Sequence, residues 1–338
     1  MSGRAAQARL AGVVLGTGAL LGVALVLAAS VGAGRASLWA LFGPADEIER
    51  AILLDVRLPR VVLAAILGGA LTVAGAVFQA LLRNPLADPY VLGVSGGASI
   101  GGIVALLFGA GSATILGSLG VPAAAFAGAL AALLLIERVA TVGGRLSVYT
   151  LLLTGAIFNA FSAALIYFLQ SIASLEELHG IVFYLMGRIP SYAASEIAVL
   201  GFAVVATVVA LTAMARDYNA LSLGEEGARQ LGVDVERVKR RTFVLGSLLT
   251  ALAVSVAGLV GFVGLVVPHV LRRLLGPDHR LLLPAAFLGG AAFLVLADLV
   301  ARVLVAPSEL PVGVVTALVG GPFFLYLLRG STRDFTGR

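Results

Sequence analysis

Residues 91–136 read VLGVSGGASIGGIVALLFGAGSATILGSLGVPAAAFAGALAALLLI, and none of these side chains is charged. A helix needs about 20 apolar residues to cross the hydrocarbon core of a bilayer. The stretch is long enough for two such helices. We expect a break at Gly117–Pro122, between helices near residues 91–110 and 118–136. The stretch therefore predicts a polytopic membrane protein.

The rest of the 338-residue chain has the same character, with 60% hydrophobic and 12% charged residues and a mean hydropathy of +1.05. Soluble domains carry about 25% charged residues. The other apolar runs of suitable length are Leu10–Gly34, Val61–Leu82, Leu146–Leu175, Ile189–Ala215, Thr242–Leu271, Leu281–Ala297 and Val303–Leu328. These runs predict an all-α chain that lies mostly in lipid.

We expect about ten transmembrane helices. The run Thr242–Leu271 is interrupted by glycines and Pro268, so it predicts a full helix at 242–258 and a short, partly re-entrant one near 262–275. The last run contributes one span after Pro311. The first run follows Arg4 and Arg9 as a signal peptide would, but its apolar part exceeds the 7–15 residues of such peptides, so we expect it to be retained.

The basic residues predict an orientation, because cytoplasmic loops are enriched in Lys and Arg. With the N-terminus inside, only six of the 23 basic residues fall outside, namely Arg35, Arg50, Arg57, Arg60, Arg188 and Arg302. Both termini are then cytoplasmic. This asymmetry accounts for the net charge of +5, so we expect the partner to be the lipid bilayer and not nucleic acid.

The sequence offers little for catalysis. It has no cysteine, its three histidines (His179, His269 and His279) are far apart, and no paired carboxylates or GxxxxGK[ST] loop occur. We therefore expect no metal site and no catalytic residue in this chain. If solute moves uphill at the expense of ATP, another chain must bind the ATP.

The only long polar stretch is Arg216–Arg241. Ser222 and Glu225 have the spacing of a capping box that starts a helix. Gly232 after Leu231 is typical of a helix end, and Asp234 would cap a second short helix through Val238. Docking onto a cytosolic partner and a solvated connector explain this stretch equally well from its chemistry alone.

Four separated blocks carry a resemblance. Residues 223–233 read LGEEGARQLGV, and the other blocks are Val56–Ala98, Gly261–Pro284 and Glu309–Leu328. In this order they resemble the FecCD family, the permeases of binding-protein-dependent ABC importers of iron chelates and cobalamin. The resemblance extends along nearly the whole chain.

The resemblance implies a type II ABC importer permease fold of ten helices, with residues 1–338 as a single transmembrane domain. It implies a homodimer with two ATP-binding subunits and a periplasmic or surface-tethered binding protein, in a bacterial or archaeal cytoplasmic membrane. ATP and Mg would be bound by the partner ATPase, and this chain would bind no cofactor. The expected function is import of an iron-siderophore, haem or cobalamin by alternating access, along a pathway lined by the fifth and tenth helices.

The resemblance also assigns roles to residues. Residues 216–241 become a cytoplasmic coupling loop that contacts the ATPase through Leu223, Gly224, Glu225, Glu226, Ala228, Arg229, Gln230, Leu231 and Gly232. Arg57, Arg60 and Arg302 become docking residues for the binding protein, although lipid contact or a local pair between Asp298 and Arg302 explains them too. The candidate inner gate is Asn84, Leu86, Val148 and Tyr149; the family often has small hydroxyl residues in place of the last two.

Residues 175–190 are expected to form a short helix over the pore mouth, with Glu176, His179 and Arg188 as candidate pore-mouth residues. Arg188 would attract an anionic chelate, but a plain rim arginine and a solvated histidine are equally compatible. The alternative function is an ion-coupled secondary transporter. Such carriers need ionisable residues in mid-span, and these spans hold almost none.

Overall fold

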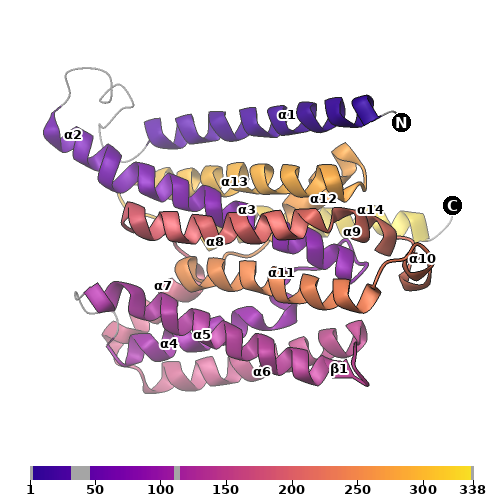
Figure 1. The fold of residues 1–338 in the computed structure, drawn as a ribbon. Helices are drawn as coiled ribbons and strands as arrows, with labels where there is room; N and C mark the ends of the chain where they lie inside the picture. Colours follow the sequence, from indigo (N-terminus) through magenta and orange to yellow (C-terminus); the bar gives the residue numbers. More distant parts are fainter. Residues whose placement is uncertain (1–2, 32–45, 110–114, 336–338) are drawn as a thin grey trace.

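The computed structural model describes residues 3–31, 46–109 and 115–335, and these form a bundle of roughly parallel and antiparallel helices (Figure 1). The predicted outer residue Arg35 lies outside the described residues. The first half contains α1 (Gly3–Ser30), α2 (Glu47–Ala51), a π-helical turn (Ile52–Arg57), α3 (Leu58–Leu81), a 3-10 turn (Pro89–Leu92), α4 (Val94–Leu107), α5 (Ile115–Ala140) and α6 (Val148–Ile172).

The second half contains α7 (Leu175–Met186), α8 (Ala194–Ala213), α9 (Ala215–Leu221), α10 (Glu225–Gln230), α11 (Val235–Ala257), α12 (Val263–Leu275), α13 (His279–Val303) and α14 (Val312–Phe335). Between α5 and α6 lies a two-stranded antiparallel hairpin, β1 (Thr141–Val142) and β2 (Arg145–Leu146). Seven of the described helices are long and apolar enough to cross a membrane. Adding α4, α12 and α14 gives ten helices among the described residues, in rough agreement with the expected number.

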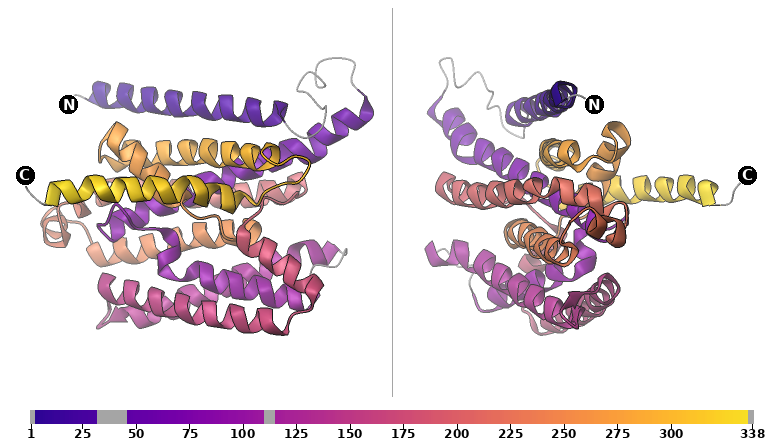
Figure 2. Two further views of the ribbon diagram at one scale, coloured as in Figure 1. Left: turned by 180° about the vertical axis from the view of Figure 1, so that it is seen from behind. Right: turned by 45° about the vertical axis from the view of Figure 1, so that its right-hand side comes forward.

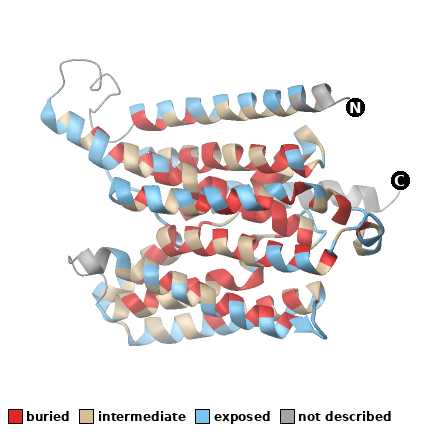
Figure 3. Cartoon of the chain, viewed as in Figure 1, coloured by how far each residue is buried: buried red, intermediate tan, exposed pale blue. Residues whose placement is uncertain are grey.

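The helix α3 is the central element of the bundle. The span that contains it, Glu47–Leu81, is 83% buried over its most apolar window, whereas α1 is 6% buried and α6 is 17% buried. Buried residues therefore gather along α3, α11 and α13, and exposed residues along the outer helices (Figure 3). The exposed side chains of the outer helices are mainly apolar, as expected for helices that face lipid or another subunit.

Glycines allow the central helices to approach closely. A Cβ on Gly75 of α3 would overlap the Gly264 carbonyl of α12, and one on Gly68 would overlap the Gly290 carbonyl of α13. Small residues at helix interfaces let backbones approach in this way in membranes. These two glycines therefore set how closely α3 packs against α12 and α13.

Two predicted boundaries are wrong. The break in residues 91–136 does not lie at Gly117–Pro122: α4 ends before Gly109, whose φ of +75° suits a helix stop, and Pro122 lies inside α5. The helix expected to start at residue 242 starts at Val235, because its first two turns are polar and extend beyond the apolar run.

The two ends of the bundle differ. The start of α1, the end of α14, the β-hairpin, α9 and α10 lie at one end, here named the coupling end (Figures 1 and 2). The opposite end, named the docking end, carries α2, α7 and the end of α1. The predicted short helix over residues 175–190 is α7, which begins with a capping box between Ser174 and Glu177. One hydrogen bond from the backbone of Ser174 and one from its side chain lower the pKa of the Glu177 carboxyl group.

Candidate functional site

The helix α10 projects at the coupling end between α9 and α11 (Figure 1). It begins after Gly224, whose φ of +95° turns the chain away from α9. It ends at Gln230, and the C-cap Leu231 is followed by Gly232 at φ +83°. Ala228 is buried, whereas the side chains of Leu223 and Leu231 are 69% and 64% exposed. The helix therefore presents two leucines to its surroundings.

Two local predictions for this loop need correction. Ser222 does not form a capping box with Glu225, because its hydroxyl donates to the Asn219 carbonyl and Gly224 occupies the N-cap position. Asp234 does cap a helix by accepting from the Arg237 N–H, as predicted. That helix is the long α11 and does not end at Val238.

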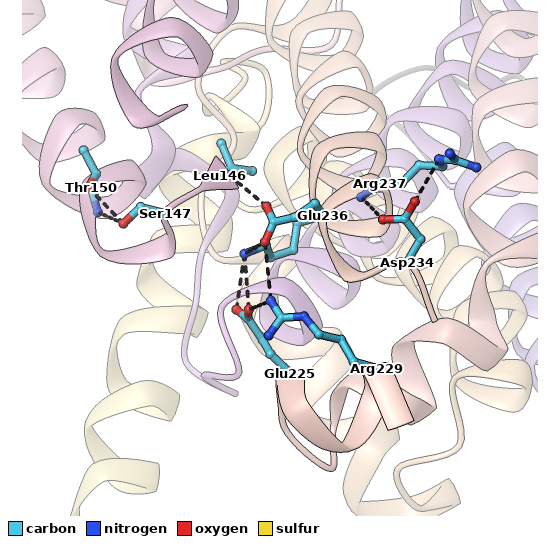
Figure 4. A network of polar contacts seen from close by, with 9 residues as sticks. Leu146, Ser147, Thr150, Glu225, Arg229, Asp234, Glu236 and Arg237 are labelled. Carbon is cyan, nitrogen blue, oxygen red and sulfur yellow. Dashed lines mark hydrogen bonds and ion pairs between the residues drawn. The ribbon is translucent and has the colours of Figure 1, made fainter. Parts of the chain in front are cut away.

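An ion-pair network connects α10 to α11 and to the hairpin (Figure 4). Glu225 lies 3.3 Å from Lys239 and 3.2 Å from Arg229. Glu236 lies 2.8 Å from Lys239 and 3.7 Å from Arg229. The other oxygen of Glu236 accepts a 2.9 Å hydrogen bond from the Leu146 N–H. One network thus joins α10 and α11, which are neighbours in the sequence, to the hairpin, which lies 90 positions away.

A polar joint holds α9 against α13 at the same end. The Asn219 side chain donates to Asp278 at 2.7 Å, and its oxygen accepts from the His279 backbone. Hydrogen bonds from Arg280 and Asn219 hold the pKa of Asp278 well below its usual range. The His279 ring also lies 2.8 Å from the Asn219 oxygen through Nδ1, so His279 is a structural hydrogen-bonding residue.

Two of the predicted docking arginines, Arg60 and Arg302, belong to one charge cluster at the docking end. Arg60 lies 2.9 Å from Asp298 and 2.7 Å from Glu309. Arg302 pairs with the other oxygen of Asp298 at 2.9 Å, which confirms the local pair predicted by their spacing. Only Glu309, about half exposed, is readily accessible from outside.

Arg57 and Arg302 are each only 5% exposed and donate to the carbonyls of Ala29 and Ala28 in the last turn of α1. Carbonyls in the last turn of a helix have no intrahelical partner. These two arginines therefore fasten α1 to the bundle. Arg60 is the most exposed of the three arginines, with 15% of its side chain accessible.

The predicted gate residues stand at the coupling end on two separate elements. Asn84 is exposed and accepts from the Leu86 N–H in the turn after α3. Val148 and Tyr149 begin α6 after Ser147, whose hydroxyl caps the helix. Tyr149 is 77% exposed. No hydrogen bond within the described residues joins the two elements.

Two of the three pore-mouth candidates share a cavity. His179 and Arg188 line a hollow of about 440 Å³ together with Tyr184 and Tyr192. The His179 ring packs against Phe183 at 4.6 Å between centroids. Glu176 is exposed and does not line this cavity. The described residues contain no cluster of three or more His, Cys, Asp or Glu that would hold a metal.

Residues 17–330 match the sequence profile of the FecCD transport family. The chain belongs to this family. Among its relatives, the cobalamin import system permease protein BtuC of Halobacterium salinarum is 45% identical over 290 residues, which is 84% of this chain and 74% of that protein. The hemin transport system permease protein HmuU of Yersinia pestis is 40% identical over 279 residues, or 82% of this chain and 83% of that protein.

The FecCD assignment agrees with the three-dimensional comparison. A solved structure described as an inward-facing conformation of a metal-chelate type ABC transporter superposes with a TM-score of 0.84 and 31% identity. The superposition covers 94% of this chain and 99% of the chain in the solved structure. The chain is therefore a multi-pass ABC importer permease, and the predicted fold class is confirmed.

Sequence reasoning missed several residues of the site. The residues predicted from the sequence do not include Lys239, Glu236 or Glu309. The i, i+3 spacing of Glu236 and Lys239 was the one available signal. The long-range pairs, such as Arg60 with Asp298, leave no trace in one sequence.

Proposed function

We propose that this FecCD chain is the membrane subunit of an ATP-driven importer of a metal chelate, such as an iron-siderophore, haem or cobalamin. It works as a homodimer with two ATP-binding subunits and an external binding protein. The observation that carries the proposal is α10, a short polar helix that presents Leu223 and Leu231 at the coupling end. The relatives named for cobalamin and hemin transport support the substrate class.

In the proposed cycle, ATP binding and hydrolysis displace α10, and the two permease subunits rock between outward- and inward-facing states. The homodimer would be formed through exposed apolar faces such as those of α6 and α14, where Ile157, Phe161, Leu318 and Leu325 are exposed. The pathway would lie between these faces. Apolar walls suit a bulky chelate because they do not hold it tightly, so it can leave the pathway again.

The rival function is an ion-coupled carrier. Such a carrier needs ionisable groups within its spans that can exchange ions. Asp298 is the buried carboxylate that comes closest to meeting this requirement, but it lies near the end of α13 and pairs with two arginines. This pairing favours a structural carboxylate over an exchangeable one.

The test reconstitutes the chain with its ATPase and binding protein in proteoliposomes that contain ATP. Uptake of radiolabelled ferric siderophore, haem and cobalamin is measured in parallel, with empty liposomes as the control. We expect one of these chelates to accumulate against its gradient. Accumulation of none of them, with all three proteins assembled and active in ATP hydrolysis, would contradict the substrate class.

A further inference from the structure

Lys239 is the only lysine of the chain, and it is 5% exposed in the second turn of α11. A buried ammonium group is costly unless carboxylates surround it. Two do so, Glu225 at 3.3 Å and Glu236 at 2.8 Å. The single lysine therefore sits at the centre of the network and not on its surface.

The two carboxylates come from different elements. Glu225 is the first residue of α10, and Glu236 belongs to the first turn of α11. Lys239 thus bonds the candidate ATPase-contacting helix to a membrane-spanning helix. Arg229 bridges the same two carboxylates, but its side chain is half exposed, where ion pairs contribute little.

Glu236 extends the connection to the hairpin. Its second oxygen accepts from the Leu146 N–H in β2, directly before Ser147, the N-cap of α6. The positions after this cap are Val148 and Tyr149. Figure 4 shows the path from Glu225 through the bridging cations to Glu236, and from Glu236 to Leu146.

Another ion pair at the coupling end connects a different pair of elements. Arg240 of α11 pairs with Glu137 near the end of α5, so it holds α11 against α5 without contacting α10. A hollow of about 390 Å³ is lined by parts of the hairpin and of the start of α11. Glu236 and Leu146, which the hydrogen bond joins, both line it.

We propose that Lys239 is a positioning residue that transmits the displacement of α10 to the start of α6 through Glu236 and Leu146. The inference rests on the proposed function, because it assumes that an ATPase moves α10. The Lys239 ammonium is buried, whereas Glu225 and Glu236 are 27% and 29% exposed. The pairs resist separation because moving the carboxylates away would leave the buried charge of Lys239 uncompensated. The network therefore moves α10 and the start of α6 together.

The first test compares Lys239→Met with Arg237→Met in the reconstituted importer. Arg237 pairs with Asp234 on the exposed side of the same helix and is the matched control. For Lys239→Met we expect normal co-purification with the ATPase and an uptake per ATP hydrolysed that falls about ten-fold, within the range for residues that couple two sites. The control should keep the wild-type ratio. An unchanged ratio for Lys239→Met would overturn the proposal.

The second test measures the movement of α10 and the movement of the start of α6 separately. The chain has no cysteine, so spin labels can be placed at Leu231→Cys beside α10 or at Tyr149→Cys on α6, both on exposed side chains. Distances between the two protomers are measured by pulsed electron resonance with and without ATP. With Lys239 present, both labels should shift on ATP binding.

In the Lys239→Met background, the label at residue 231 should still shift and the label at residue 149 should not. Glu236→Ala is the second variant, because it keeps the Glu225–Lys239 pair and removes the bond to Leu146; we expect the same result. A residue 149 label that shifts as in wild type in both variants overturns the inference. If wild-type protein shows no ATP-dependent uptake, the proposed function fails instead.

Discussion

The Arg60 guanidinium binds one oxygen of Asp298 through Nε and Nη2, at 3.1 and 2.9 Å, across 238 positions of sequence. The other oxygen of Asp298 pairs with Arg302 at 2.9 Å. One buried carboxylate thus balances two guanidinium groups at the docking end. This cluster connects α3 to α13, and through Arg302 it connects both to α1.

The first prediction concerns the stability of this cluster. Asp298→Asn should lower the free energy of unfolding by about 3–5 kcal/mol, because it leaves buried arginines without their counter-charge. Glu309→Gln is the control, and it should cost less than about 1 kcal/mol because that partner is half exposed. Thermal unfolding in detergent measures both. Equal losses for the two variants would show that Asp298 is not the centre of the cluster.

The second prediction separates docking from coupling. If Arg60 contacts the binding protein, Arg60→Gln should weaken docking about ten-fold, as for a central interface residue, and leave ATPase assembly intact. Glu226→Arg should do the opposite. Glu226 suits this test because it is exposed and, within the described residues, takes part in no ion pair. The affinities for the binding protein and for the ATPase are both measured on the purified permease. If the two variants change these affinities in the same way, the assignment of Arg60 to docking and Glu226 to coupling is wrong.

Arg57 is a poorer docking residue than the sequence indicated. It is 5% exposed and donates to Ala29, so charge reversal there should reduce folding as well as docking. The comparison of Arg57→Glu with Arg60→Gln by size-exclusion chromatography checks this point. We expect a monodisperse peak for Arg60→Gln only.

The third prediction tests the gate. Tyr149→Cys should form a disulfide across the homodimer on oxidation if the starts of the two α6 helices meet in the closed state. Uptake should then stop and recover on reduction. Phe202→Cys on α8 is the control, since it is equally exposed and lies on another helix. Uptake that is insensitive to oxidation in both variants would place the gate elsewhere.

The fourth prediction concerns helix packing. Gly75→Ala should destabilise the protein by about 1–3 kcal/mol, because the new Cβ meets the Gly264 carbonyl and overpacking forces backbones apart. Gly16→Ala on α1 is the control, since its Cβ would meet nothing. Thermal unfolding compares the two. A stable Gly75→Ala variant would mean that α3 and α12 are farther apart than described.

Hydropathy predicted the spans well because burial in lipid requires long apolar runs. The glycines and Pro268 predicted the separate α12, and the short helix expected over residues 175–190 is α7. Hydropathy failed where the helices continue beyond the apolar region. The span of α3 begins at Glu47 with charged residues, and α11 begins at Val235 because its polar turns pair with α10 and the hairpin.

The site was predicted in part. Local spacing gave the Asp234 cap and the Asp298–Arg302 pair, which depend on residues three and four apart. The capping box at Ser222 failed because Gly224 turns the chain before the helix starts. Arg60 with Asp298, and Glu236 with Leu146, depend on how distant segments fold together, and one sequence contains no record of that.

The most direct test of the account measures how uptake is powered. Proteoliposomes that contain the permease, its ATPase and its binding protein are loaded with ATP or left without nucleotide, and ionophores collapse the ion gradients in both. The account predicts chelate uptake that requires ATP and persists with ionophores. Uptake that proceeds without nucleotide and stops when the gradients collapse would contradict it.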